Sequence, residues 1–192
     1  QALERVTNSQ VDTRWSDAQY SQSPWNKSAT DPDWAGVSTF KDCREVVSTA
    51  RAQNIWESIE AIGGDTGWYG SDLLWKIRGM LDTLVGGAGL RRGRRDPKRL
   101  RKGESLDFWR VDEIDHGRYL RLIAEMKLPG EAWLEFELLN DESVGATRII
   151  QTATFIPRGL SGRMYWYAIA PFHFLVFPTM IRNIEKASHQ VI

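Results

Sequence analysis

The sequence predicts an α+β fold in which an antiparallel sheet wraps around a long C-terminal helix, with two shorter helices after the first strand. Three observations predict it. Two segments with apolar residues at helical spacing follow a first alternating segment, the period changes to strict alternation after Ser105, and the chain ends in a long apolar run. At 192 residues the chain fits one domain, which can bury roughly 70% of its unfolded surface.

We expect residues 1–36 to form an irregular N-terminal arm or a linker from a preceding domain, and residues 37–192 to form the folded domain. The arm is rich in Ser, Asp and Gln, yet it carries Trp15, Trp25 and Trp34 at spacings that match neither a helix nor a strand. A disordered tail rarely contains so many large apolar side chains. The first residue is not Met, so we interpret the sequence as part of a longer polypeptide.

The first strand and the two helices follow in order. FKDCREVVS, residues 40–48, fits a strand with Cys43, Glu45 and Val47 on one face. Ser48 or Thr49 is expected to cap a short helix whose apolar stripe is Ile55, Ile59 and Ile62 and which ends at Gly63 and Gly64. A second helix is expected to begin at Ser71 or Asp72, to carry an apolar stripe through Val85 and to end at Gly86 and Gly87.

Alternation predicts an antiparallel meander after Ser105. In residues 118–128 one face carries Leu120, Leu122, Ala124, Met126 and Leu128, and residues 132–138 repeat this pattern. Leu128-Pro129-Gly130-Glu131 is a hairpin connection between them. Two further strands are expected at about 106–114 and 146–156, which makes one face of the sheet apolar and the other charged.

Ser161 is expected to cap a long terminal helix that reaches about Ser188. The run from Met164 to Ile181 is long and apolar enough to raise the question of a membrane span, but His173, Thr179, Pro171 and Pro178 interrupt it. We therefore expect a buried helix, kinked at its prolines and held by the sheet, rather than a membrane span. This order of elements describes a helix-grip fold.

The charge is balanced over the whole chain and concentrated locally. Lys+Arg and Asp+Glu are each 25, but residues 91–102 hold eight basic residues and one acid, a net charge of +7. Because the remainder is acidic, we expect no nucleic acid partner. Cys43 is the single cysteine, which points to a cytoplasmic location, and three dispersed histidines give no metal-ligand spacing.

Several motifs resemble an uncharacterised bacterial domain family that is similar to the helix-grip superfamily of polyketide cyclases, START domains and Bet v 1. They are GWY (67–69), LLWKIRGMLDTLVGG (73–87), GLRRGRRDP (89–97), LDFWRV (106–111), MKLPGEAWLEFE (126–137) and YWYAIAPFHFLVF (165–177). The resemblance implies a hydrophobic ligand and a preceding NAD(P)-binding domain similar to atypical short-chain dehydrogenases. It implies no catalytic residue set. No nucleotide fingerprint lies in this chain, so a bound cofactor is expected only in an attached domain.

Aromatic side chains are the candidate wall of a ligand cavity, and a packed core is the alternative. The candidates are Trp68, Tyr69, Trp75, Trp109, Tyr165 and His173, with Trp166 and Tyr167 beside them. His173 is the titratable group of the apolar helix, and both a structural and a catalytic role stay open for it.

Charged residues give two further candidates. Arg91, Arg92, Arg94 and Arg95 are expected either to bind an anion or a partner or to pair with the acidic strands. Glu125, Glu135 and Glu137 with Arg121 are either an acid/base group inside the cavity or an exposed strand face with cross-strand charge pairs.

We predict an accessory module that binds an apolar small molecule or lipid-like ligand and works with a reductase-like domain in the same chain or in another. Two alternatives stay open. One is a cyclase-like or dehydratase-like enzyme for a polyketide- or steroid-like substrate, with His173, Tyr165 or Glu135 as acid/base. The other is a protein docking domain that uses the arginine loop.

Overall fold

The computed structural model describes residues 39–70, 79–80, 94–141 and 145–190. The chain divides into two units, residues 1–38 and 39–192, and the description concerns the second. The predicted arm with its three tryptophans, most of the predicted second helix, and Trp75, Arg91 and Arg92 lie outside the described residues.

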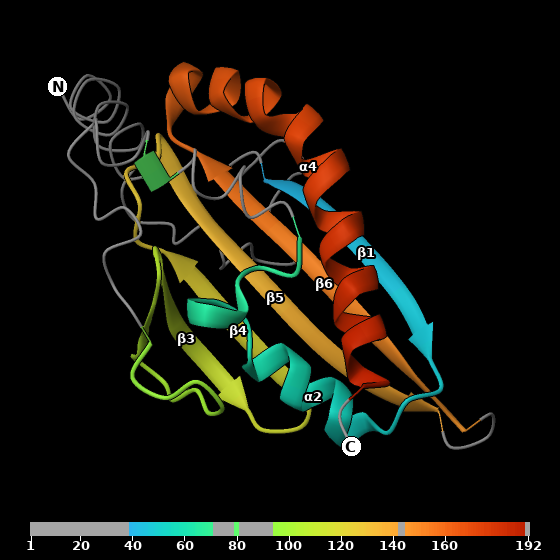
Figure 1. The fold of residues 1–192 in the computed structure, drawn as a ribbon. Coiled ribbons are helices and arrows are strands. Elements are labelled where there is room, and N and C mark those ends of the chain that lie inside the picture. The colour runs from blue at the N-terminus through green and yellow to red at the C-terminus, as the bar shows by residue number, and fades with distance from the viewer. Residues whose placement is uncertain (1–38, 71–78, 81–93, 142–144, 191–192) are drawn as a thin grey trace, which may run out of the picture. The chain divides into compact units, whose positions relative to one another are not determined.

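The described elements follow the predicted α+β order. They are β1 (Phe40–Ser48), α2 (Ala52–Glu60), the 3-10 turn η1 (Gly64–Thr66), β2 (Ser105–Leu106), β3 (Trp109–Asp115), β4 (Tyr119–Ala124), β5 (Gly130–Asp141), β6 (Ala146–Pro157) and α4 (Gly159–Ser188). The six strands form one antiparallel sheet in the order β1-β6-β5-β4-β3-β2. Figure 1 shows α4 lying along β6 and β1 on the face of the sheet that α2 also covers. This arrangement is a helix-grip fold.

Alternation fixes which face of the sheet packs under the helices. Leu122 pairs with Leu134, and Phe136 pairs with Gln151, so these residues share the inner face. Leu120, Leu122, Leu134 and Phe136 are fully buried there, as the predicted faces require. Burial of a Leu or Phe side chain contributes roughly 1.5–3 kcal/mol, so this face supplies much of the stability of the sheet.

The predicted strand 106–114 is wrong in one respect, because it contains a turn. Leu106 pairs with Trp109 across a two-residue connection, which makes β2 and β3 separate antiparallel strands. Asp107 has φ +54, and Asp adopts this left-handed conformation more readily than most residues. The predicted strand 118–128 also ends early, at Ala124, although the hairpin to β5 is confirmed.

The predicted caps of α2 and α4 are wrong, and the predicted cap at Ser71 or Asp72 lies outside the described residues. The cap residue of α2 is Arg51 and that of α4 is Arg158, and neither provides a side-chain hydrogen bond. Ser48 instead accepts a hydrogen bond from the amide of Ala50 and donates one to Glu185 of α4 at 3.2 Å. Its hydroxyl therefore connects the end of β1 to the last turns of α4.

The terminal helix is buried in only part of its length. Val176, Phe177, Met180, Ile181 and Ile184 are buried in the core, whereas Leu160, Met164, Tyr167, Phe174 and Leu175 are between 60% and 73% exposed. The expectation of a buried helix is therefore wrong for the first half, because the sheet covers one side of a helix that is apolar all round. The two prolines lie inside the helix, and Figure 1 shows it bending. By length and composition alone α4 could cross a membrane, and 22% of its most apolar window is buried.

Candidate functional site

Two of the predicted ligand-binding aromatics, Trp68 and Trp109, lie in the core. Trp68 is 2% exposed and stacks on Phe108 with ring centroids 5.6 Å apart, and its centroid lies 6.1 Å from that of Trp109. The indole N–H of Trp68 donates to Asp107 at 2.9 Å within this buried cluster. The structure thus brings Trp68 and Trp109 together as core residues.

Tyr69 connects two helices. It has φ +51, a left-handed conformation that costs a bulky residue energy and persists only where its surroundings hold it. The hydroxyl of Tyr69 donates to the carbonyl of Ser58 in α2 at 2.9 Å, and Asn183 of α4 donates to the carbonyl of Tyr69 at 2.8 Å. Burial raises the pKa of the Tyr69 phenol.

Tyr165 and His173 belong to a second aromatic group at the first half of α4. Trp166 stacks on Phe155 of β6 and contacts the His173 ring edge-on, with centroids 4.9 Å apart. Tyr165 lies against the same Phe155 at 5.5 Å. Tyr165 and His173 thus lie with Phe155 and Trp166, whereas Trp68 and Trp109 lie with Phe108.

The inner face also carries polar residues that sequence reasoning did not single out. Gln151 of β6 is 1% exposed, and neither its Nε2 nor its Oε1 has a hydrogen-bond partner among the described residues. In register it faces Arg44 of β1 on one side and Phe136 of β5 on the other. Arg44 holds Asp42 through two hydrogen bonds of 2.6 and 3.2 Å, and its guanidinium lies 5.4 Å from the ring centroid of Phe174 in α4.

The described part of the arginine loop is a rigid segment. Arg94 is half-buried and donates to the carbonyls of Ile62 at 2.8 Å and Asp96 at 3.0 Å, so it fastens the loop to the end of α2. Burial lowers the pKa of its guanidinium, and nearby carboxylates, Glu104 foremost, oppose that shift. Arg95 pairs with Glu104 at 3.1 Å, which supports the predicted alternative of pairing with acidic residues.

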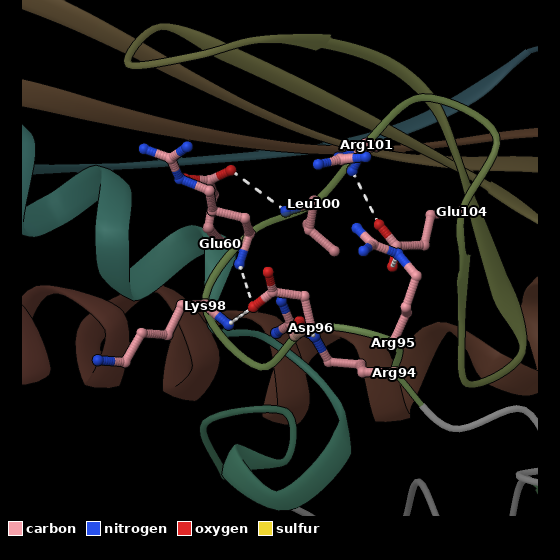
Figure 2. Close-up of polar contacts among 9 residues, drawn as sticks. Glu60, Arg94, Arg95, Asp96, Lys98, Leu100, Arg101 and Glu104 are labelled. Carbon is pink, nitrogen blue, oxygen red and sulfur yellow. Dashed lines mark hydrogen bonds and ion pairs between the residues drawn. The ribbon is translucent and has the colours of Figure 1, made fainter.

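Three carboxylates hold the backbone of this loop, as Figure 2 shows. Asp96 accepts from the amides of Lys98 and Arg99, Glu60 from that of Leu100, and Glu104 from that of Arg101. The pKa of Asp96 is lowered, and the hydrogen bond from the amide of Lys98 contributes most to this shift. The side chain of Leu100 is 1% exposed and anchors the loop in the core.

A groove of about 910 Å³ lies beside this loop. Its walls come from α2, from residues 98–101, from the β3–β4 turn and from the end of α4. The lining includes Trp56, Glu60, Tyr69, Lys98, Arg99, Arg101 and His116. Of the predicted site residues that the structure describes, only Tyr69 contributes to it. The others come from four separated stretches of sequence, and the charge run was the one signal that could have indicated Lys98, Arg99 and Arg101.

Glu60 is the central polar group of the groove. Its Oε1 accepts the amide of Leu100 at 3.3 Å and lies 3.1 Å from Nδ1 of His116, and its side chain is 8% exposed. His116 in turn packs edge-on against Trp56, with centroids 6.4 Å apart. His116 lies in the turn between β3 and β4, and its ring contacts α2.

The interpretation of Glu125, Glu135 and Glu137 with Arg121 as an internal acid/base group is wrong. Glu135 pairs in register with Arg121, and both lie opposite the inner face that holds Leu134. Arg121 binds Asp112 at 2.7 Å and Glu113 at 2.9 Å, while Tyr119 donates to Glu135 at 2.5 Å. The alternative of cross-strand charge pairs is confirmed, although Arg121 and the three glutamates are half-buried and not exposed.

One further cluster has the residue types of a hydrolytic triad but not its geometry. Nε2 of His189 lies 2.8 Å from Oε1 of Glu185. This same nitrogen also lies 3.5 Å from the hydroxyl oxygen of Ser48. In a triad the two nitrogens of the imidazole bind different partners, whereas here one nitrogen faces both the carboxylate and the hydroxyl. Ser48 is also only 1% exposed, so a substrate does not reach its hydroxyl. Within the described ranges no group of three or more His, Cys, Asp or Glu could hold a metal ion.

The comparisons give a family. Residues 34–180 match the model of the family described as "Protein of unknown function (DUF2867)". The chain belongs to this family. No curated protein matches the sequence.

Solved structures similar to the chain include norcoclaurine synthase from Thalictrum flavum, with 11% identity, a TM-score of 0.47, and coverage of 86% of this chain and 96% of that one. Protein MLL2253 from Mesorhizobium loti has 8% identity and a TM-score of 0.46, over 80% of this chain and 99% of that one. Ara h 8.0201 has 10% identity and a TM-score of 0.44, over 80% and 99%.

Proposed function

We propose that the domain binds an apolar small molecule between the inner face of the sheet and α4, and that Gln151 orients this ligand. The observation that carries the proposal is the carboxamide of Gln151, which is buried and has no hydrogen-bond partner in the part of the chain that the structure describes. Leaving a buried polar group unsatisfied costs about 1–3 kcal/mol, and native structures contain few such groups. A ligand that supplies the missing hydrogen bonds gives the residue a role.

The chemistry of Gln151 limits the polar end of the ligand. Its Nε2 donates and its Oε1 accepts, so the best complement offers one acceptor beside one donor. A primary amide, a lactam or an un-ionised carboxylic acid has this pair. Arg44 already holds Asp42 through two hydrogen bonds, so the charges beside Gln151 are matched and a neutral ligand is favoured.

The surroundings support an apolar body for the ligand. Phe136 lies beside Gln151 on the inner face, and Phe177 of α4 is 4% exposed in the same core. Because the amide atoms are enclosed, the ligand has to take the place of atoms that now cover them. The helix α4 supports such a movement, since Pro171 and Pro178 within it each lack an amide for the helical hydrogen-bond pattern.

The test compares decanamide with N,N-dimethyldecanamide, which lacks the N–H donors, in thermal unfolding of the wild-type protein and of Gln151→Met. We expect decanamide to raise the unfolding temperature of the wild type and the dimethyl compound to do so much less. Gln151→Met should be more stable than the wild type by about 1–2 kcal/mol, because it removes the unsatisfied amide, and should not respond to decanamide. A less stable variant, or equal effects of the two amides, contradicts the proposal.

The context of this binding activity follows from the family resemblance. We propose an accessory module in the cytoplasm, joined to or associated with a reductase-like domain that carries NAD(P) itself. Co-purification of the domain with a reductase-like protein, or its presence in the same chain, tests this part independently of the ligand.

A further inference from the structure

The groove beside the arginine loop has the size and position of a second site, distinct from the inner face. Its volume of about 910 Å³ lies within the roughly 300–1,000 Å³ of small-molecule sites. Neither Gln151 nor Arg44 lines it. Its walls belong to α2, the loop, the β3–β4 turn and the end of α4, so a ligand here and a ligand between sheet and α4 do not compete for the same residues.

Three cations line the groove without a carboxylate partner. Within the described ranges the side chains of Lys98, Arg99 and Arg101 make no ion pair, although their backbone amides are hydrogen-bonded. They differ in this from Arg94, whose guanidinium donates hydrogen bonds to two backbone carbonyls, and from Arg95, which forms an ion pair with Glu104. The guanidinium groups are therefore available to an anion, which arginine binds with two parallel hydrogen bonds.

The nearby carboxylates are committed elsewhere. Glu60 accepts the amide of Leu100 and faces His116, and Glu57 accepts from Gln53 one turn earlier in α2 at 3.0 Å. Asp96 and Glu104 each hold loop amides. Their hydrogen bonds fix the loop in one conformation, so the cations are displayed on a pre-organised backbone and little ordering is needed on binding.

The apolar wall carries a second, independent signal. Trp56 lines the groove and is 5% exposed, and its indole Nε1 has no hydrogen-bond partner within the described ranges. An indole N–H is a donor only, so a buried one without an acceptor loses a hydrogen bond that water would give. An oxygen of a bound anion is the acceptor that this donor lacks.

We infer that the groove binds a small organic anion, in which a phosphate, carboxylate or sulfonate group is attached to a flat apolar body. The anionic group pairs with Arg99, Arg101 and Lys98, and the flat body packs along Trp56 and Tyr69. A nucleic acid strand does not fit this description, because the cations belong to one loop of a domain whose other charges are mainly acidic.

The experiment uses a pair of fluorescent probes with the same rings. 1-Anilinonaphthalene-8-sulfonate carries the anion, and N-phenyl-1-naphthylamine lacks it. We expect the wild-type protein to bind the sulfonate at least tenfold more tightly than the neutral probe, with an affinity that falls as salt increases. In Arg99→Glu/Arg101→Glu the preference should be lost or reversed.

Matched controls keep this result specific. Lys41→Glu/Arg182→Glu makes the same change of charge at two exposed residues outside the groove, and should leave the preference unchanged. Trp56→Phe keeps a ring but removes the N–H, and should weaken the sulfonate several-fold more than the neutral probe. Thermal unfolding of each variant reports whether it is folded.

Competition then separates the anionic groups. 1-Naphthyl phosphate and 1-naphthoate are each expected to displace the sulfonate probe, and the stronger competitor identifies the preferred group. Equal binding of the two probes, or an equal loss in both charge-reversed variants, overturns the inference. Gln151→Met should leave probe binding unchanged, so failure of this site and failure of the inner-face site give different results.

Discussion

The indole N–H of Trp68 donates a hydrogen bond of 2.9 Å to the carboxylate of Asp107, and both residues are buried. The bond joins the loop after α2 to the turn between β2 and β3, across 39 residues of sequence. Asp107 also holds the left-handed conformation that this two-residue turn needs. One side chain therefore fixes both the turn and the position of the core tryptophan.

Replacement of Asp107 is expected to separate these two roles. Asp107→Ala loses the acceptor for Trp68 and places Ala at φ +54, so the free energy of unfolding should fall by about 2–4 kcal/mol. Asp107→Asn keeps a carbonyl acceptor and tolerates the left-handed region, so its loss should be smaller by at least 1 kcal/mol or so. Urea unfolding followed by tryptophan fluorescence measures both. Equal losses in the two variants would show that neither role belongs to residue 107.

The sheet is where sequence reasoning succeeded, and the reason is physical. Strand alternation has a period of two, so Leu122 and Leu134 could be assigned to the inner face without knowing their partners, and the structure pairs them there. The same alternation assigned Glu135 and Arg121 to the outer face. β1 has the bounds that the pattern predicted, and the exposure of its side chains alternates from Phe40 to Val47.

The caps and the groove could not be predicted because they depend on contacts between distant segments. Ser48 is a residue type that often caps helices, but its hydroxyl donates a hydrogen bond to Glu185, 137 residues later in the chain. The groove joins Trp56, Arg99 and His116, which the chain order does not bring together. Alternation places Gln151 on the inner face, but the absence of a partner for its amide depends on what the neighbouring strands and α4 present to it.

Gly130 begins β5 at a point where two strands approach too closely for a side chain. A Cβ on this residue would lie 2.2 Å from the carbonyl oxygen of Ile156 and 2.7 Å from Cζ of Phe155. Gly130→Ala should therefore cost about 2–3 kcal/mol of unfolding free energy, since backbone has to move. Gly145→Ala is the matched control, because its φ of +61 is left-handed but its Cβ meets open space, and it should cost about 1 kcal/mol. Thermal and urea unfolding rank the two, and a larger loss at Gly145 would refute the steric argument.

Tyr119 gives a prediction in the alkaline range. Burial raises the pKa of its phenol above the usual value of 10.0, and the hydrogen bond to Glu135 raises it further. The unfolded chain therefore loses this proton at lower pH than the folded protein. The stability that this interaction contributes is complete below about pH 10 and is lost progressively as the pH rises above it.

Tyr119→Phe should consequently be less stable than the wild type at pH 8, by about 1 kcal/mol for the lost hydrogen bond, and the difference should shrink at pH 10.5 to 11. Glu135→Gln keeps an acceptor but removes the negative charge, so in that background the contribution of Tyr119 should decline over a narrower pH range. Urea unfolding at each pH measures the differences, and absorbance of tyrosinate near 295 nm follows the ionisation directly. A difference between Tyr119→Phe and the wild type that grows as the pH rises would mean that the folded protein favours the ionised phenol, contrary to its contact with Glu135.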